Sequence, residues 1–127
     1  MFAPKDKTRP CLLLAYTDSA QAARCARQCR RQGWEVHQTR SGREARRLAG
    51  IIEPIVVVLD VDLADESGWL TAAKLLLERP RQKILLAGAE HTPRRERFAR
   101  FVGAARFITR AETMAALEDH LHVLVST

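Results

Sequence analysis

The sequence contains no apolar run of the about 18 residues that a membrane-spanning helix requires. Its first ten residues, MFAPKDKTRP, are charged and lack the apolar core of a secretory signal peptide. These two absences predict a cytoplasmic protein that does not enter the membrane. Linkers, internal repeats and low-complexity segments are also missing, and a length of 127 residues favours one domain over residues 1–127.

Cysteine is scarce, and the three that are present, Cys11, Cys25 and Cys29, cannot all pair with one another in disulfides. A structural metal site uses about four ligands, and the four histidines are scattered along the chain. We therefore expect buried free thiols and no metal site.

Aromatic residues make up only 6% of the sequence, whereas the net charge is +6 and is carried mostly by arginine. This charge permits nucleic acid, anionic lipid or an acidic protein face as partner, without choosing among them. The arginines recur at Arg24–Arg31, Arg43–Arg47 and Arg94–Arg100, and such charged helix faces are usually solvated. Nucleic-acid binding would gain from aromatic side chains beside the charges, but most aromatics fall at expected core or strand positions.

Short apolar runs alternate with helical patterns along the chain. Strands are expected at residues 11–15, 34–39, 55–60, 83–88 and 106–108. Helices are expected after each strand, starting at Asp18 or Ser19, at the capping box Ser41–Glu44, near Trp69, at Thr92–Pro93 and at the capping box Thr109–Glu112. Phe98, Phe101 and Val102 are expected to face inward, as are Met114, Leu117, Leu121 and Leu124 of the last helix. Five strand–helix units in strict alternation predict an α/β fold, a doubly wound five-stranded parallel sheet with helices on both faces.

The third expected strand, IVVVLD, ends on an acid, Asp60. In a doubly wound sheet, sites form at the carboxyl ends of the strands, near the point where the strand order reverses. Asp60 is therefore either a site residue or a loop aspartate that caps the next turn. The pattern of this stretch alone does not choose between the two.

Several stretches resemble the response-regulator receiver domain. VVVLDVDLADESGW (56–69) resembles its third strand, its phosphoacceptor aspartate and the serine–glycine pair that follows. Three shorter stretches resemble the starts of its second strand, second helix and fifth strand. They are, in that order, WEV after Gly33, SGREA at 41–45 and Gly103–Ala104 before Phe107. The resemblance covers about residues 10–124 and implies a (βα)5 flavodoxin-like, CheY-like fold with strand order 2-1-3-4-5. It places the phosphoacceptor at Asp60.

The acid pair that holds a divalent cation in this family is missing. Tyr16 and Thr17 stand at those positions in LLLAYTDSA, and Asp18 comes one place late, where it is either a helix cap or a ligand. Asp62 is near Asp60 in the sequence, but the direction in which its side chain points is open. Since Mg²⁺ wants oxygen ligands in octahedral geometry, we expect no metal cofactor here and doubtful Mg²⁺ binding.

Three further family positions differ. The threonine or serine that ends the fourth strand is Gly88, the switch aromatic on the fifth strand is Phe107 without a hydroxyl, and the lysine is Arg110. Both phosphorylation and its readout are expected to be impaired. Arg110 either pairs with Asp60 or is a solvated charge at a helix start.

These observations favour an atypical receiver, a pseudo-receiver. It would act as a protein-interaction module in two-component signalling rather than as an enzyme. The resemblance implies a histidine kinase or an output protein as partner, and a surface on helix four, strand five and helix five that also serves homodimers. Exposed residues there are expected among Arg97, Arg100, Arg106, Glu112, Ala115 and Asp119. The alternatives are a weak phosphoacceptor modified on Asp60 by a histidine kinase, and, less favoured, a basic nucleic-acid-binding domain on the same fold.

Overall fold

A computed structural model of the chain describes residues 9–113 and 115–118. Its elements are β1 (Cys11–Ala15), α1 (Ser19–Arg31), β2 (Glu35–Thr39), α2 (Gly42–Ile52), β3 (Val56–Asp60), α3 (Gly68–Glu78), β4 (Lys83–Gly88), α4 (Pro93–Val102), β5 (Arg106–Thr109) and the 3₁₀ turn η1 (Arg110–Glu112). Residues 115–118, after η1, are helical. Met114, Asp119, Leu121 and Leu124, for which the sequence predicts core or surface positions, lie outside the described residues.

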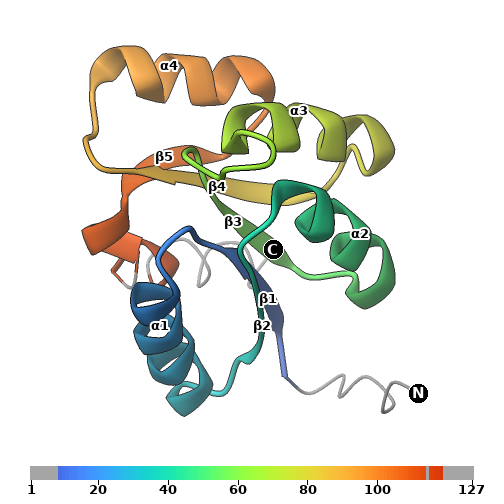
Figure 1. Cartoon of the computed structure of the whole chain (residues 1–127), viewed down its shortest axis with the longest axis vertical. Helices are drawn as coiled ribbons and strands as arrows, with labels where there is room; N and C mark the ends of the chain where they lie inside the picture. The colour runs from blue at the N-terminus through green and yellow to red at the C-terminus, as the bar shows by residue number, and fades with distance from the viewer. Residues whose placement is uncertain (1–8, 114, 119–127) are drawn as a thin grey trace.

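The five strands form one parallel sheet in the order β2-β1-β3-β4-β5 (Figure 1). This confirms the expected doubly wound sheet and its strand order. The order reverses between β1 and β3, so the carboxyl ends of these two strands border the crevice in which this fold class places its sites. Asp60, the last residue of β3, lies at that crevice.

Two apolar layers hold the sheet between helices, with α1 on one face and α2, α3 and α4 on the other (Figure 1). On the α1 side, alternate residues of β1 such as Leu12 and Leu14 pack against Ala22, Cys25 and Cys29. On the opposite side, Leu13 and Ala15 belong to the second layer, with Ala45 and Ala49 of α2 and Leu75 of α3 among its members. Strands buried on both faces explain the continuous apolar runs in the sequence. No helix of the described part is long and apolar enough to cross a membrane.

Side-chain caps determine where the helices begin. Asp18 accepts hydrogen bonds from the amides of Ala20 at 2.9 Å and Gln21 at 3.1 Å, so it is the cap of α1 rather than a ligand. The hydroxyls of Ser41 and Thr92 cap α2 and α4 in the same way. The expected helix starts are confirmed, and α2 runs to Ile52.

The expectation that Phe98 and Phe101 face inward is wrong. Phe98 is 46% exposed and Phe101 84% exposed, while Ala99 is fully buried and Val102 is half-buried. The sequence offers two apolar pairs at the same spacing of three, 98 with 101 and 99 with 102. The structure places the smaller pair against the sheet, because a small side chain lets a short helix approach the strands closely.

Candidate functional site

Asp60 is fully buried at the carboxyl end of β3, between β1 and β4. The next helix, α3, begins in direct contact with Asp60, because Gly68 at its start lies against the backbone of Asp60. A Cβ on Gly68 would come within 2.3 Å of the Asp60 carbonyl oxygen. The serine–glycine pair after the loop is therefore needed for packing: Ser67 caps α3 and Gly68 allows the close approach.

Each carboxylate oxygen of Asp60 accepts two hydrogen bonds. Oδ1 accepts from the amide of Asp62 at 3.0 Å and from Nη2 of Arg110 at 2.7 Å. Oδ2 accepts from the amide of Thr17 at 3.2 Å and from Nε of Arg110 at 3.0 Å. A carboxylate offers about four lone-pair positions. The carboxylate of Asp60 is therefore saturated by the protein itself.

Arg110 connects two acids at this end of the sheet. Besides its two bonds to Asp60, its Nη2 donates to Oδ2 of Asp62 at 2.6 Å. Of the two roles that the sequence leaves open for Arg110, the structure shows the ion pair. It also gives Asp62 a direction: this exposed side chain turns back toward the same guanidinium.

The pKa values of the pair reflect this contact. Burial by itself raises the pKa of Asp60, but hydrogen bonds from Arg110 and from the amides of Asp62 and Thr17 outweigh it, so the pKa is lowered. The hydrogen bond with Asp60 is the main cause that raises the pKa of Arg110 further above its ordinary value. The pair is therefore ionised at neutral pH.

Tyr16 and Thr17, at the positions of the missing acid pair, have separate roles. Tyr16 is fully buried in the layer under α1, and its hydroxyl shares a hydrogen bond with the hydroxyl of Thr113. Burial raises the pKa of Tyr16, so the phenol stays neutral. Thr17 is exposed and contributes its amide to Asp60, while its hydroxyl donates to the carbonyl of Asp62 at 3.3 Å.

This arrangement does not fit a magnesium ion. Mg²⁺ requires oxygen ligands in near-octahedral geometry. Around Asp60 the neighbouring side chains are a phenol turned into the core, a threonine, a guanidinium and the carboxylate of Asp62, which that guanidinium already binds. Nη2 of Arg110 lies between the carboxylates of Asp60 and Asp62, where a cation bridging them would lie. A fixed positive charge at that place repels a second cation.

The positions of the family's hydroxyl and switch aromatic, Gly88 and Phe107, are in direct contact. Phe107 is fully buried, and a Cβ added to Gly88 would come within 2.7 Å of the tip of its ring. The ring is stacked on Trp69 at a centroid distance of 5.5 Å and is covered by the guanidinium of Arg95 at 5.6 Å. A hydroxyl-bearing side chain at 88 and the ring in this place exclude one another.

The loop between β3 and α3 holds an acid that the sequence analysis did not single out. Asp65 accepts hydrogen bonds from the hydroxyl of Ser41 at 2.8 Å and from the amides of Gly42 at 2.9 Å and Arg43 at 3.1 Å. Although desolvation raises its pKa, these bonds lower it to about 2. Asp65 thus binds the amino terminus of α2, where the helix dipole favours negative charge.

Glu66, the next residue, was also missed. Its carboxylate is nearly buried and accepts from Nε and Nη2 of Arg46, both at 3.0 Å, and from the hydroxyl of Thr71 at 2.9 Å. Nζ of Lys74 lies 3.4 Å from Oε2 of Glu66. Arg46, expected to be solvated, is therefore part of a buried ion pair. A buried acid in a polar loop 20 residues from its partner leaves no periodic signal in the sequence.

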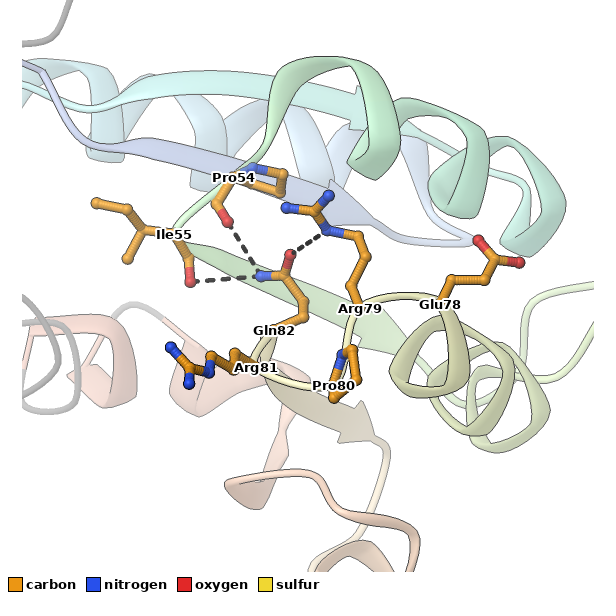
Figure 2. A pocket seen from close by; sticks show the side chains of 7 residues that line it. All are labelled: Pro54, Ile55, Glu78, Arg79, Pro80, Arg81 and Gln82. Atoms are coloured by element: carbon orange, nitrogen blue, oxygen red, sulfur yellow. Dashed lines mark hydrogen bonds between the residues drawn. The ribbon is translucent and has the colours of Figure 1, made fainter.

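Two other groups of residues lie away from Asp60. Figure 2 shows the residues that line a hollow at the amino ends of β3 and β4, where the side-chain amide of Gln82 donates to the carbonyls of Pro54 and Ile55. The hollow has a volume of about 420 Å³. Cys11, Glu35 and His37 bring one potential ligand atom each within 4.8 Å of one another. Three donors fall short of the four that structural zinc sites use.

The surface that the resemblance assigns to partners is partly occupied by internal ion pairs. Glu96 of α4 accepts from the amide of Phe107 at 2.9 Å and pairs with Arg100 and Arg106, both at 3.4 Å. The remaining expected residues that the structure describes, Arg97, Glu112 and Ala115, are exposed. The arginines of α4 are thus not equivalent, because within the part of the chain that the structure describes only some of them pair with an acid.

No protein-family model and no curated protein matches the chain. Solved structures do match. The receiver domain of a Francisella response regulator is 17% identical, with a TM-score of 0.84 over 91% of this chain and 96% of that one. The receiver domain of a LuxO-type repressor of Vibrio parahaemolyticus is 18% identical, with a TM-score of 0.83 over 93% and 91%. A Burkholderia pseudomallei response regulator with a phosphorylated aspartic acid and calcium is 22% identical, with a TM-score of 0.75 over 90% and 71%.

At these identities the likeness concerns the fold. The agreement with the Francisella domain extends over 91% of this chain. The chain has the fold of the CheY-like response-regulator receiver domains.

Proposed function

We propose that this chain is a pseudo-receiver, a binding module of two-component signalling that acts without Mg²⁺-dependent phosphorylation of Asp60. The observation that carries the proposal is the double contact of Arg110 with Asp60 and its third contact with Asp62. A receiver needs a free carboxylate oxygen as nucleophile and a divalent cation to neutralise the phosphoryl group. Here the guanidinium occupies the oxygens and provides the positive charge.

A module of this kind performs no chemistry of its own and transmits a signal through its surface. The proposed partners are a histidine kinase or an output protein of the same signalling class. The contact of Phe107 with Gly88 supports a single arrangement of the switch-equivalent positions, since the ring fills the space that a side chain at 88 would take. We therefore propose that a partner, rather than a phosphoryl group, determines the state of this domain.

The weak-phosphoacceptor alternative requires Arg110 to leave Asp60 before any reaction. Removing it would strand a buried carboxylate next to Asp62, which costs free energy in the ground state. The closed ion pair therefore favours the pseudo-receiver over a phosphoacceptor.

The proposal is tested by titrating Mg²⁺ into the protein and following backbone amide chemical shifts. The amides of Thr17 and Asp62 are the best reporters, because both donate to Asp60. We expect no saturable change at millimolar Mg²⁺. Saturable shifts of these two amides that disappear in Asp60→Asn would contradict the proposal.

A further inference from the structure

Exposed aromatic side chains line a groove between α3 and α4. Its volume is about 680 Å³, and its lining includes Trp69, Phe98, Phe101 and the arginines Arg94, Arg95 and Arg97. We call it the α3–α4 groove. It lies apart from Asp60 but borders β5, because its residues Trp69 and Arg95 contact the Phe107 ring. It shares Arg97 with the surface that the resemblance assigns to partners.

The aromatic side chains of the groove form one continuous apolar strip. The ring of Trp69 meets Phe98 edge-on at a centroid distance of 4.9 Å, and Phe98 is stacked on Phe101 at 6.1 Å. Phe101 is 84% exposed, which is unusual for so large an apolar side chain on a short helix. Exposed apolar strips of this kind mark binding surfaces.

The charge beside this strip is positive, and no acid within residues 9–113 and 115–118 neutralises it. Among the residues that the structure describes, no carboxylate pairs with Arg94 or Arg97, and none lines the groove. By contrast, Arg100 and Arg106 pair with Glu96, which turns toward β5. The groove therefore presents free positive charge next to an apolar strip.

We infer that the α3–α4 groove binds an acidic amphipathic helix of a partner protein. Bulky apolar residues of that helix would pack on Phe98 and Phe101, and its acids would pair with Arg94 and Arg97. An amphipathic helix placed in a groove uses anchors at i and i+3 or i+4, with charges beside them. This inference rests on the proposed function only in that both describe a binding module.

A peptide fits the aromatic strip better than single-stranded nucleic acid does. Bases stack on the open faces of aromatic rings. Here the near-parallel rings of Phe98 and Phe101, at 18°, face one another, and Phe98 is also met by the edge of Trp69. The ring of Phe98 is therefore partly covered by its two aromatic neighbours, whereas Phe101 stays exposed, and a hollow of about 680 Å³ remains for the side chains of a peptide.

The test uses two pools of fluorescent helical peptides that carry the same Leu, Phe or Trp anchors. One pool has Glu and Asp on the polar face, the other has Lys and Arg. Fluorescence anisotropy with the full chain should select acidic members over their basic counterparts. Phe101→Ala and Arg97→Glu should each weaken the selected peptide at least about tenfold, the effect of losing a central anchor or a needed charge.

Matched controls change similar residues elsewhere. Ile51→Ala removes an exposed apolar side chain from α2, and Arg27→Glu reverses an exposed charge on α1. Both should bind the selected peptide like the unchanged protein.

Three outcomes overturn the inference. They are equal binding of acidic and basic pools, loss of binding in the controls as well, and Phe101-dependent self-association without peptide. Single-stranded RNA that binds at about 150 mM salt, is lost in Arg97→Glu and competes with the peptide would assign the groove to nucleic acid instead. Failure here leaves the Mg²⁺ result at Asp60 unchanged, so the two proposals fail independently.

Discussion

Arg110 donates to both carboxylate oxygens of Asp60, with Nη2 2.7 Å from Oδ1 and Nε 3.0 Å from Oδ2. This planar double contact joins β3 to the segment that follows β5, 50 residues along the chain. It also leaves the acid without a free oxygen.

The pair is expected to show strong coupling in a double-mutant cycle. Arg110→Met should lower the free energy of unfolding by about 2–4 kcal/mol, because it strands a buried carboxylate. Asp60→Asn should cost less, since Arg110 keeps its contact with Asp62. The double variant should be more stable than the sum of both losses predicts. Urea denaturation measures all four proteins, and additive losses would argue against the pair.

Stability should depend on the ionisation of Asp60 at acid pH. Its folded-state pKa is lowered, so its contribution is complete above the unfolded value of about 3.9 and is lost as the pH falls through the folded value. The difference in unfolding free energy between the unchanged protein and Asp60→Asn should therefore be large at pH 7 and shrink below about pH 4. A difference that is the same at pH 7 and pH 3 would rule this out.

Side chains at position 88 should compete with the Phe107 ring. Gly88→Thr should destabilise the protein by about 1–3 kcal/mol, as overpacking does, because its Cβ comes within 2.7 Å of that ring. The double variant that carries Gly88→Thr and Phe107→Leu should lose less stability than the sum of the losses of the two single variants. Gly50→Ala is the control: nothing lies within 4 Å of its Cβ position, and it should stabilise α2 by about 0.5–1 kcal/mol. Thermal unfolding of the four variants would refute the contact if Gly88→Thr behaved like the control.

Loss of the Glu66 charge should destabilise the loop between β3 and α3. Glu66→Gln keeps the shape but removes the partner of Arg46 inside a nearly buried network, at a cost of about 2–4 kcal/mol. Glu44→Gln breaks an exposed pair with Arg47 and should destabilise the protein far less, because solvent screens that pair. Equal effects of the two substitutions in chemical denaturation would contradict the buried role of Glu66.

The strand order was predictable because apolar runs and helical patterns alternate without exception, and parallel sheets allow few topologies. The place of Asp60 follows from the same pattern. The face of α4 was not predictable, since Phe98 and Phe101 have the same spacing as Ala99 and Val102. The contacts of Glu66 with Arg46, and of Arg110 with Asp60 and Asp62, depend on how distant segments meet. The local sequence left the pairing of Arg110 with Asp60 open as one of two alternatives. It gave no indication of the contact between Glu66 and Arg46.

Whether Asp60 accepts a phosphoryl group distinguishes a pseudo-receiver from a phosphoacceptor most directly. The protein is incubated with Mg²⁺ and a small phosphodonor such as acetyl phosphate, and its intact mass is measured under acidic conditions that preserve acyl phosphates. Thr17→Asp with Arg110→Lys, which returns an acid and the family's lysine to the site, is the comparison variant. We predict no gain of a phosphoryl mass in the unchanged protein. A gain that is absent from Asp60→Asn would contradict the account.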